Sequence, residues 1–152
     1  MGTDIDTVYI VDDDPTVREA LSSLLRATGK NVRLFTCGED FLAVERDDMP
    51  ACLILDLEMP GMNGLDVQRN VSATIPIVFI SGRGDVESTV KAMKGGASDF
   101  LTKPVEEARL LAAVEVALYE HRIAWRDALY RAGLLERYRS LTPREQEVWR
   151  FW

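Results

Sequence analysis

The chain has 152 residues, a net charge of −7 and 47% hydrophobic residues, which suits one ordinary domain with an appendage. The whole net charge lies in residues 1–104, which hold 17 acidic and 10 basic residues, because residues 105–152 hold eight of each. This acidic first part argues against non-specific binding of nucleic acid. Two cysteines, Cys37 and Cys52, are too few for a disulfide framework and lack metal-ligand spacing.

The sequence shows no targeting or membrane segment. Asp4 and Asp6 stand where a signal peptide needs basic residues and then an apolar stretch. No apolar run approaches the ~20 residues that a membrane span needs. We therefore expect a cytoplasmic protein without a membrane partner, in which both cysteines are free thiols.

Short apolar runs alternate with longer amphipathic stretches along the chain. The runs, which predict strands, are 8–11, 32–35, 51–55, 77–80 and 99–102. The predicted helices are Asp14–Gly29 (with Asp14 as N-cap and Pro15 first), Gly38–Arg46, Gly64–Ser72, Asp85–Lys94 and a last one from Val105. Five such βα units predict an α/β fold, in which helices cover both faces of a doubly wound parallel five-stranded sheet.

Polar side chains follow four of the five predicted strands. In chain order they are Asp12, Asp13 and Asp14, then Asp56, Ser81 and Lys103. Ligands of parallel sheets bind at the carboxyl ends of the strands. We therefore expect these side chains to converge on one edge.

Three crowded carboxylates repel each other and need a counter-ion, and hard oxygen ligands suit Mg²⁺. A carboxylate beside a divalent cation can attack a phosphoryl group and form an acyl phosphate. Because the transferred group is rich in charge, its catalysis is mostly positioning and charge neutralisation. Lys103 is suited to supply positive charge, and the Ser81 hydroxyl can donate to a phosphoryl oxygen.

These residues resemble the receiver domain of two-component response regulators. The resemblance covers roughly residues 7–122, so we assign residues 1–122 to this domain. It rests on four motifs in order: Asp12-Asp13, Asp56 followed by Met59-Pro60-Gly61, Ser81-Gly82, and Phe100-Leu101-Thr102-Lys103-Pro104. Each motif alone is weak, but the ordered set is specific. It implies the CheY-like fold with the flavodoxin-like strand order 2-1-3-4-5.

The resemblance also implies the role of each site residue. Asp56 would accept phosphate from a sensor histidine kinase. Asp13 would bind Mg²⁺, for which Mn²⁺ can substitute, together with Asp12, Asp56 and the backbone carbonyl of Glu58. Lys103 would contact the phosphoryl group, and its peptide bond to the following proline would be cis.

A phosphorylated receiver of this family signals through a change of packing. The resemblance implies that Ser81 moves toward the phosphate and that Phe100 fills the vacated space, although Phe100 can also be interpreted as plain core filling. The surface of the helix 86–94, the strand 99–102 and the helix after Val105 would then change and form a phosphorylation-dependent homodimer.

The last helix is predicted to extend well beyond a usual receiver. It would run to about Ala132, before Gly133, a length of roughly 40 Å. Apolar side chains at 3-4 spacing make a coiled-coil seam one interpretation and packing on the receiver or on a neighbouring domain another. We assign residues 123–140 to a helical linker.

Residues 141–152 resemble the opening of the LuxR-type helix-turn-helix domain of NarL/FixJ response regulators. Thr142, Pro143 and Glu145 have the pattern of a capping box with proline at the first helical position. A recognition helix, which would enter the major groove, does not follow. We therefore interpret the segment as the truncated start of that domain and expect DNA binding only from the full-length protein.

Other functions remain as alternatives. A receiver without a DNA-binding output would act by protein contacts. A haloacid-dehalogenase-like phosphatase also uses an Asp nucleophile after a strand, but it expects a second Asp where this chain has Glu58. A flavodoxin-type cofactor binder would need a phosphate-binding loop after the first strand. We expect a phosphoacceptor switch, not an enzyme, whose only chemistry is Mg²⁺-dependent self-phosphotransfer and autodephosphorylation.

Overall fold

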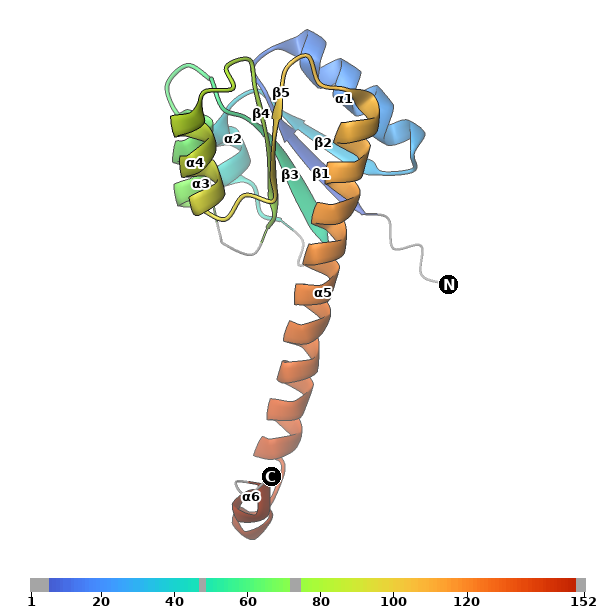
Figure 1. The fold of residues 1–152 in the computed structure, drawn as a ribbon. Coiled ribbons are helices and arrows are strands. Elements are labelled where there is room, and N and C mark those ends of the chain that lie inside the picture. Colours follow the sequence, from blue (N-terminus) through green and yellow to red (C-terminus); the bar gives the residue numbers. More distant parts are fainter. Residues whose placement is uncertain (1–5, 47–48, 72–74, 150–152) are drawn as a thin grey trace. The chain divides into compact units, whose positions relative to one another are not determined.

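The computed structural model describes residues 6–46, 49–71 and 75–149 (Figure 1). The chain divides into two compact units, Met1–Arg122 and Ile123–Trp152. The first unit contains one parallel sheet of five strands in the order β2-β1-β3-β4-β5. The strands are β1 (Thr7–Val11), β2 (Asn31–Phe35), β3 (Ala51–Asp56), β4 (Ile77–Ser81) and β5 (Asp99–Thr102).

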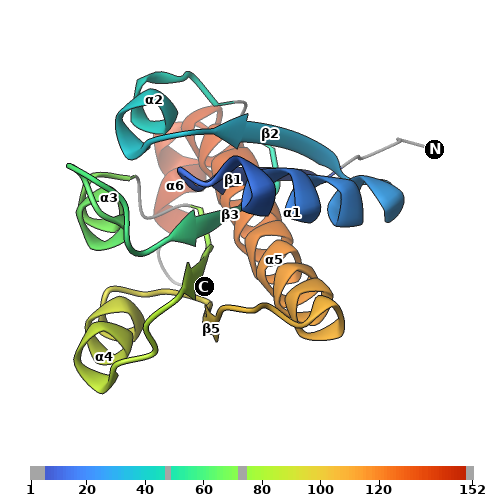
Figure 2. The ribbon, with the colours of Figure 1, turned by 90° about the horizontal axis from the view of Figure 1, so that it is seen from above.

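Helices follow the strands, as the alternating pattern predicts. They are α1 (Pro15–Ala27), α2 (Gly38–Ala43), α3 (Gly64–Asn70), α4 (Val86–Lys94) and α5 (Glu107–Arg139), with α6 (Pro143–Trp149) near the end. Viewed from above, α1 and the first part of α5 cover one face of the sheet, and α2, α3 and α4 cover the other (Figure 2). The doubly wound α/β fold and its strand order are thus confirmed.

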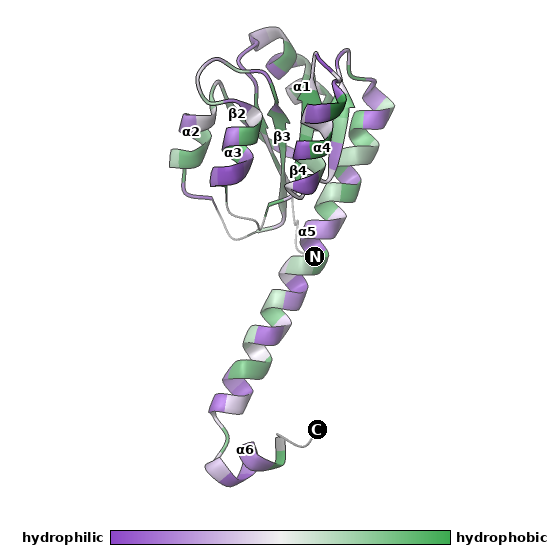
Figure 3. Ribbon diagram, turned by 60° about the vertical axis from the view of Figure 1, so that its left-hand side comes forward, coloured by the Kyte–Doolittle hydropathy of each residue, from purple (hydrophilic) through white to green (hydrophobic). Residues whose placement is uncertain are grey.

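Each face of the sheet has its own hydrophobic core because successive strand residues point to opposite faces. In β1, Val8 and Ile10 pack with residues of α1 and α5, whereas Tyr9 and Val11 pack with residues of α2, α3 and α4. Every residue of β3 and β4 is buried, and these central strands are predominantly hydrophobic (Figure 3). Burial on both faces explains why their sequences are apolar runs without alternation.

Local sequence signals place the first helix. The Asp14 side chain accepts a hydrogen bond from the Thr16 N–H at 2.9 Å, and Pro15 is the first helical residue. Gly29, two residues after α1, has a φ of 84°, which a residue without Cβ adopts at little cost. The turn after α1 therefore brings the chain back to begin β2.

The first part of α5 is held against the sheet. Its buried face consists of Leu110, Ala113, Val114, Ala117 and Leu118. The ring of His121 lies 2.8 Å from the backbone nitrogen of Ala51, and Lys30 forms an ion pair with Glu115 at 2.6 Å. Packing on the receiver is therefore the correct interpretation for this part of the predicted seam. A coiled coil remains a prediction for the part after residue 122.

The predicted end of α5 before Gly133 is wrong, since the helix continues to Arg139. A glycine inside a helix costs only roughly 1 kcal/mol relative to alanine, so neighbouring residues with high helix propensity can outweigh it. Leu134, Leu135 and Glu136 follow directly and are such residues. Gly133 also lacks the positive φ that a glycine just after a helix end commonly adopts.

The second unit contains the end of α5, a short turn and α6. The capping box at the start of α6 is confirmed: Thr142 N–H donates to Glu145 Oε1 at 3.0 Å, and Glu145 N–H donates to Thr142 Oγ1 at 3.3 Å. Large apolar side chains of this unit, among them Leu129 and Tyr130, are exposed. Among the described residues, no helix combines the length and hydropathy needed to cross a bilayer.

We predict that Gly133→Ala stabilises the end of α5, by about 1 kcal/mol for local opening of the helix. The added Cβ would meet no atom within 4 Å. Slower amide hydrogen exchange of residues 134–139 would show the effect. Gly29→Ala is the matched control: it should destabilise the first unit, because its φ of 84° strains an alanine. Faster exchange in Gly133→Ala would contradict a continuous helix.

Candidate functional site

The functional groups predicted from the sequence lie at the carboxyl edge of the sheet. Asp12 directly follows β1, Asp56 and Ser81 are the last residues of β3 and β4, and Lys103 directly follows β5. The strand order reverses between β1 and β3, and such a switch point is where open α/β sheets bind ligands. The structure thus brings residues from four strands to one place.

Three carboxylates form the centre of the site. One carboxylate oxygen from each of Asp12, Asp13 and Asp56 lies within 4.8 Å of the others. Asp12 and Asp56 are buried, whereas Asp13 is exposed. Asp14 does not belong to this group, since it caps α1. A partly open set of hard oxygen ligands fits Mg²⁺, which keeps several waters when a protein binds it.

One ammonium group faces the two buried carboxylates. Lys103 Nζ lies 3.1 Å from Asp12 Oδ2 and 3.3 Å from Asp56 Oδ1. Within the described part of the chain, these two buried oxygens have no hydrogen-bond partner apart from this ion pair. A single ammonium cannot neutralise three carboxylates, so the site keeps a negative charge that a divalent cation would balance.

This environment shifts the pKa of both kinds of group. Burial and, to a smaller extent, the charge of Asp12 raise the pKa of Asp56 from 3.8 to about 7, although Lys103 opposes both effects. For Lys103, burial works to lower the pKa, but the hydrogen bonds and charges of Asp12 and Asp56 outweigh it and raise that pKa. A carboxyl group with such a raised pKa is typical of a functional site.

Ser81 is fully buried and contacts the loops beside the site. Its Oγ lies 2.6 Å from Glu58 Oε1 and 2.6 Å from the backbone carbonyl of Arg83. The Arg83 N–H in turn lies 2.9 Å from both Glu58 Oε1 and Ser81 Oγ. The sequence predicts a role only for the backbone carbonyl of Glu58. This side-chain contact was not predicted, and the acidic residue two positions after Asp56 was the available signal.

Backbone contacts hold the two key strand ends in position. Lys103 N–H donates to the Ser81 carbonyl at 2.7 Å, and the Lys103–Pro104 bond is cis, as the resemblance implied. At the start of α3, Gly64 N–H donates to the Leu57 carbonyl at 2.9 Å. A Cβ on Gly64 would lie only 2.6 Å from the Asp56 carbonyl oxygen. Gly64 is therefore also a residue of the site. It was not predicted from the sequence, because its role is to let the start of α3 lie close to the Asp56 backbone.

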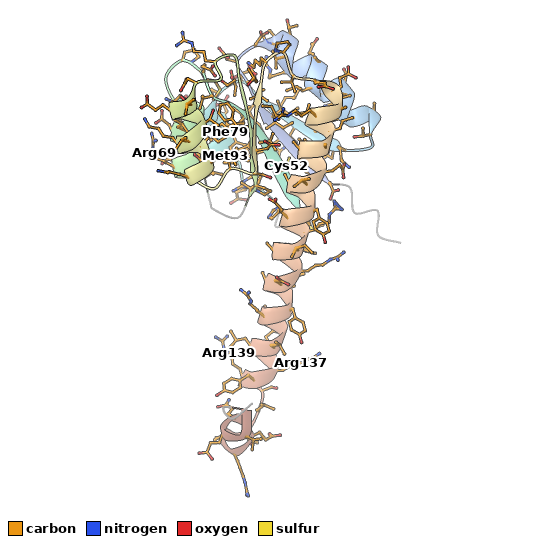
Figure 4. All side chains as sticks on the ribbon, in the orientation of Figure 1. Cys52, Arg69, Phe79, Met93, Arg137 and Arg139 are labelled. Carbon is orange, nitrogen blue, oxygen red and sulfur yellow. The ribbon has the colours of Figure 1, made fainter. Side chains whose placement is uncertain are left out.

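Phe100 is a buried part of the core between the sheet and α4. Its ring centroid lies 6.1 Å from that of Phe79, which is labelled in Figure 4. Core filling therefore describes its position in this structure. The role of a switch aromatic stays a prediction.

Comparison with known proteins agrees with this geometry. The family described as "Response regulator receiver domain" matches residues 8–115. The chain belongs to the response regulator receiver family. It is 47% identical over 147 residues to response regulator protein TodT of Pseudomonas putida, with 95% of this chain and 65% of TodT covered.

Other relatives extend the comparison. Transcriptional regulatory protein FixJ of Bradyrhizobium diazoefficiens is 36% identical, with 93% of this chain and 70% of FixJ covered. The solved structure of response regulator StyR has a TM-score of 0.85 and 45% identity, with 97% of this chain and 76% of that chain covered. The receiver is thus a signalling domain of the two-component type, and the chain spans about 65% of the length of TodT.

We predict that Asp56→Asn stabilises the metal-free receiver in a pH-dependent way. The Asp56 carboxyl has a pKa of about 7 when folded and near 3.8 when unfolded, so the folded state keeps this proton to higher pH. Stability of the wild type is therefore lost as pH rises from 4 to 7, and the variant avoids this loss. Its advantage should be near zero at pH 4 and on the order of 2 kcal/mol at pH 8.

Urea denaturation in the presence of EDTA at several pH values measures this difference. The control is Asp40→Asn on α2, where the side chain is exposed and stability should change by less than about 0.5 kcal/mol. If the gain in unfolding free energy of Asp56→Asn does not grow with pH, the raised pKa of the buried Asp56 carboxyl is contradicted.

Proposed function

We propose that this receiver accepts a phosphoryl group on Asp56 from a sensor histidine kinase and thereby changes its protein contacts. The observation that carries the proposal is the position of the buried Asp56 carboxylate, within 3.3 Å of Lys103 Nζ and next to Asp12 and Asp13. In the proposed step, an Asp56 oxygen attacks phosphorus, the bond from phosphorus to the kinase histidine breaks, and the released imidazole takes up a proton.

The neighbours of Asp56 have distinct tasks in this step. Asp12, Asp13, Asp56 and the Glu58 carbonyl are the proposed ligands of Mg²⁺. When bound, the metal neutralises charge on the phosphoryl oxygens. Lys103 opposes the rise in the pKa of Asp56 that burial causes, and it then pairs with the phosphoryl group. We propose that the same residues, acting on a water molecule, carry out autodephosphorylation. We expect no turnover of free substrates.

The arrangement of Glu58 favours a switch over a phosphatase. A haloacid-dehalogenase-like enzyme would need an acid at this position to exchange protons with the leaving group. The Glu58 carboxylate is engaged with Ser81 and with the Arg83 N–H. This engagement supports a structural task for Glu58.

We propose that the phosphoryl signal leaves the receiver through α4, β5 and α5. Ser81 and Phe100 lie on adjacent strands, β4 and β5, so a movement of Ser81 changes the space available to the Phe100 ring. On α4, Val86 and Met93 are exposed, and an exposed apolar surface suits a phosphorylation-dependent homodimer.

The output that we propose is transcriptional control by a longer, cytoplasmic protein. We assign residues 1–122 to the receiver, 123–140 to a helical linker and 141–152 to the start of a LuxR-type DNA-binding domain. The capping box at Thr142 supports this assignment, as does the similarity to FixJ, a transcriptional regulatory protein. DNA would be contacted only by that C-terminal domain.

Incubation with acetyl phosphate and Mg²⁺ should add one phosphoryl group to the wild type and none to Asp56→Asn. Intact-mass measurement gives the number of groups added. Asp40→Asn, an exposed change of the same kind on α2, should be phosphorylated like the wild type. An unchanged phosphoryl gain in Asp56→Asn would place the acceptor elsewhere.

Mg²⁺ should raise the thermal stability of the wild type, by about 2.7 kcal/mol at a hundred times the dissociation constant. Asp13→Asn should weaken Mg²⁺ binding at least about tenfold, because it removes a charged ligand. Thermal melting across a Mg²⁺ titration measures both effects. Asp14→Asn is the matched control, since Asp14 caps α1 and asparagine also caps helices. Equal losses in the two variants would contradict the assignment of Asp13.

A further inference from the structure

The Glu58 carboxylate connects two loops beside the phosphoacceptor site. Glu58 follows β3, and its Oε1 accepts hydrogen bonds from Ser81 Oγ at 2.6 Å and from Arg83 N–H at 2.9 Å. Both donors belong to the end of β4 and the loop before α4. A Cβ on Gly82, between them, would lie 4.0 Å from the same oxygen, so the loop passes directly over the carboxylate.

The Ser81 hydroxyl has one proton and two acceptors at the same distance. Its Oγ lies 2.6 Å from Glu58 Oε1 and 2.6 Å from the Arg83 carbonyl. A hydrogen bond to a carboxylate is roughly twice as strong as one to a neutral carbonyl. The hydroxyl proton is therefore directed mainly to Glu58 in this arrangement.

A phosphoryl group on Asp56 needs the same donor. It adds negative charge and strong acceptor oxygens at the end of β3, two residues before Glu58 along the chain. The two anions then compete for the Ser81 hydroxyl. Both cannot hold the single hydroxyl proton.

We propose that Glu58 is a positioning residue that holds Ser81 and Arg83 in the unphosphorylated arrangement, and that the phosphoryl group must displace its carboxylate to recruit the Ser81 hydroxyl. This inference rests on the proposed role of Asp56. Glu58 thereby sets the balance between the two states of the loop before α4. Loss of the Glu58 contact shifts that balance toward the phosphorylated arrangement.

Beryllofluoride with Mg²⁺ tests the proposal, because it imitates an aspartyl phosphate and binds at equilibrium. Glu58→Ala removes the acceptor, and Glu58→Asp keeps the charge but shortens the side chain by about 1.5 Å. Both variants should bind beryllofluoride about tenfold more tightly than the wild type, which corresponds to the loss of one charge-assisted hydrogen bond. Glu58→Gln keeps a neutral acceptor oxygen and should gain less.

The three variants separate a hydrogen bond from simple repulsion between charges. If Glu58 acted only by its charge, Glu58→Ala and Glu58→Gln would gain equally and Glu58→Asp would bind like the wild type. That result would overturn the proposal. Glu58 is exposed, so these variants should fold, and thermal melting confirms it. All of them keep the backbone carbonyl that is proposed to bind Mg²⁺.

A second pair of measurements follows the route through Ser81. In a Ser81→Ala background, Glu58→Ala should improve beryllofluoride binding less than twofold, whereas a full gain would overturn the proposal. In the free protein, Glu58→Ala should shift the amide resonance of Arg83 toward its position in the beryllofluoride-bound wild type. An unmoved Arg83 resonance would also overturn it.

The proposed function and this inference fail in different ways. If the wild type does not bind beryllofluoride, or if Asp56→Asn binds it equally well, the role of Asp56 is wrong and the inference about Glu58 is wrong with it. If the wild type binds, Asp56→Asn does not, and Glu58→Ala binds like the wild type, only the inference about Glu58 is overturned.

Discussion

The structure of the site depends on electrostatic crowding at the carboxyl edge of the sheet. Asp12 and Asp56 are buried, and the ammonium of Lys103 is the one cation within ion-pair distance of them in the described part of the chain. Such carboxylates are costly to bury without further compensation. The uncompensated negative charge suits this site to a divalent cation.

The fold supports this crowding because helices cover both faces of the central strands β3 and β4. Two separate hydrophobic cores hold β3 and β4 between helix layers, so the strand ends cannot move apart to relieve the repulsion. Gly64 lets α3 begin close to the Asp56 backbone, which fixes the position of Asp56 from a second direction. Stability of the cores thus maintains an arrangement that is locally unfavourable.

Short hydrogen-bonded loops connect the acidic carboxyl edge of the sheet to the surface near α4. Ser81 links the end of β4 to Glu58 after β3 and to Arg83 before α4. The proposed phosphoryl group on Asp56 would act on these groups, because they lie at or beside the ends of the adjacent strands β3 and β4. A small change of partners at Ser81 can therefore alter the neighbouring space of Phe100 and the exposed face of α4.

The sequence by itself determined the fold class and the composition of the site. Apolar runs separated by capped amphipathic stretches predicted five βα units, and the position of Asp12, Asp56, Ser81 and Lys103 after those runs predicted their convergence. Tertiary structure alone decided the side-chain partners of Glu58 and the close approach at Gly64. These features depend on which loops meet in space, and the spacing of residues along one segment does not encode that.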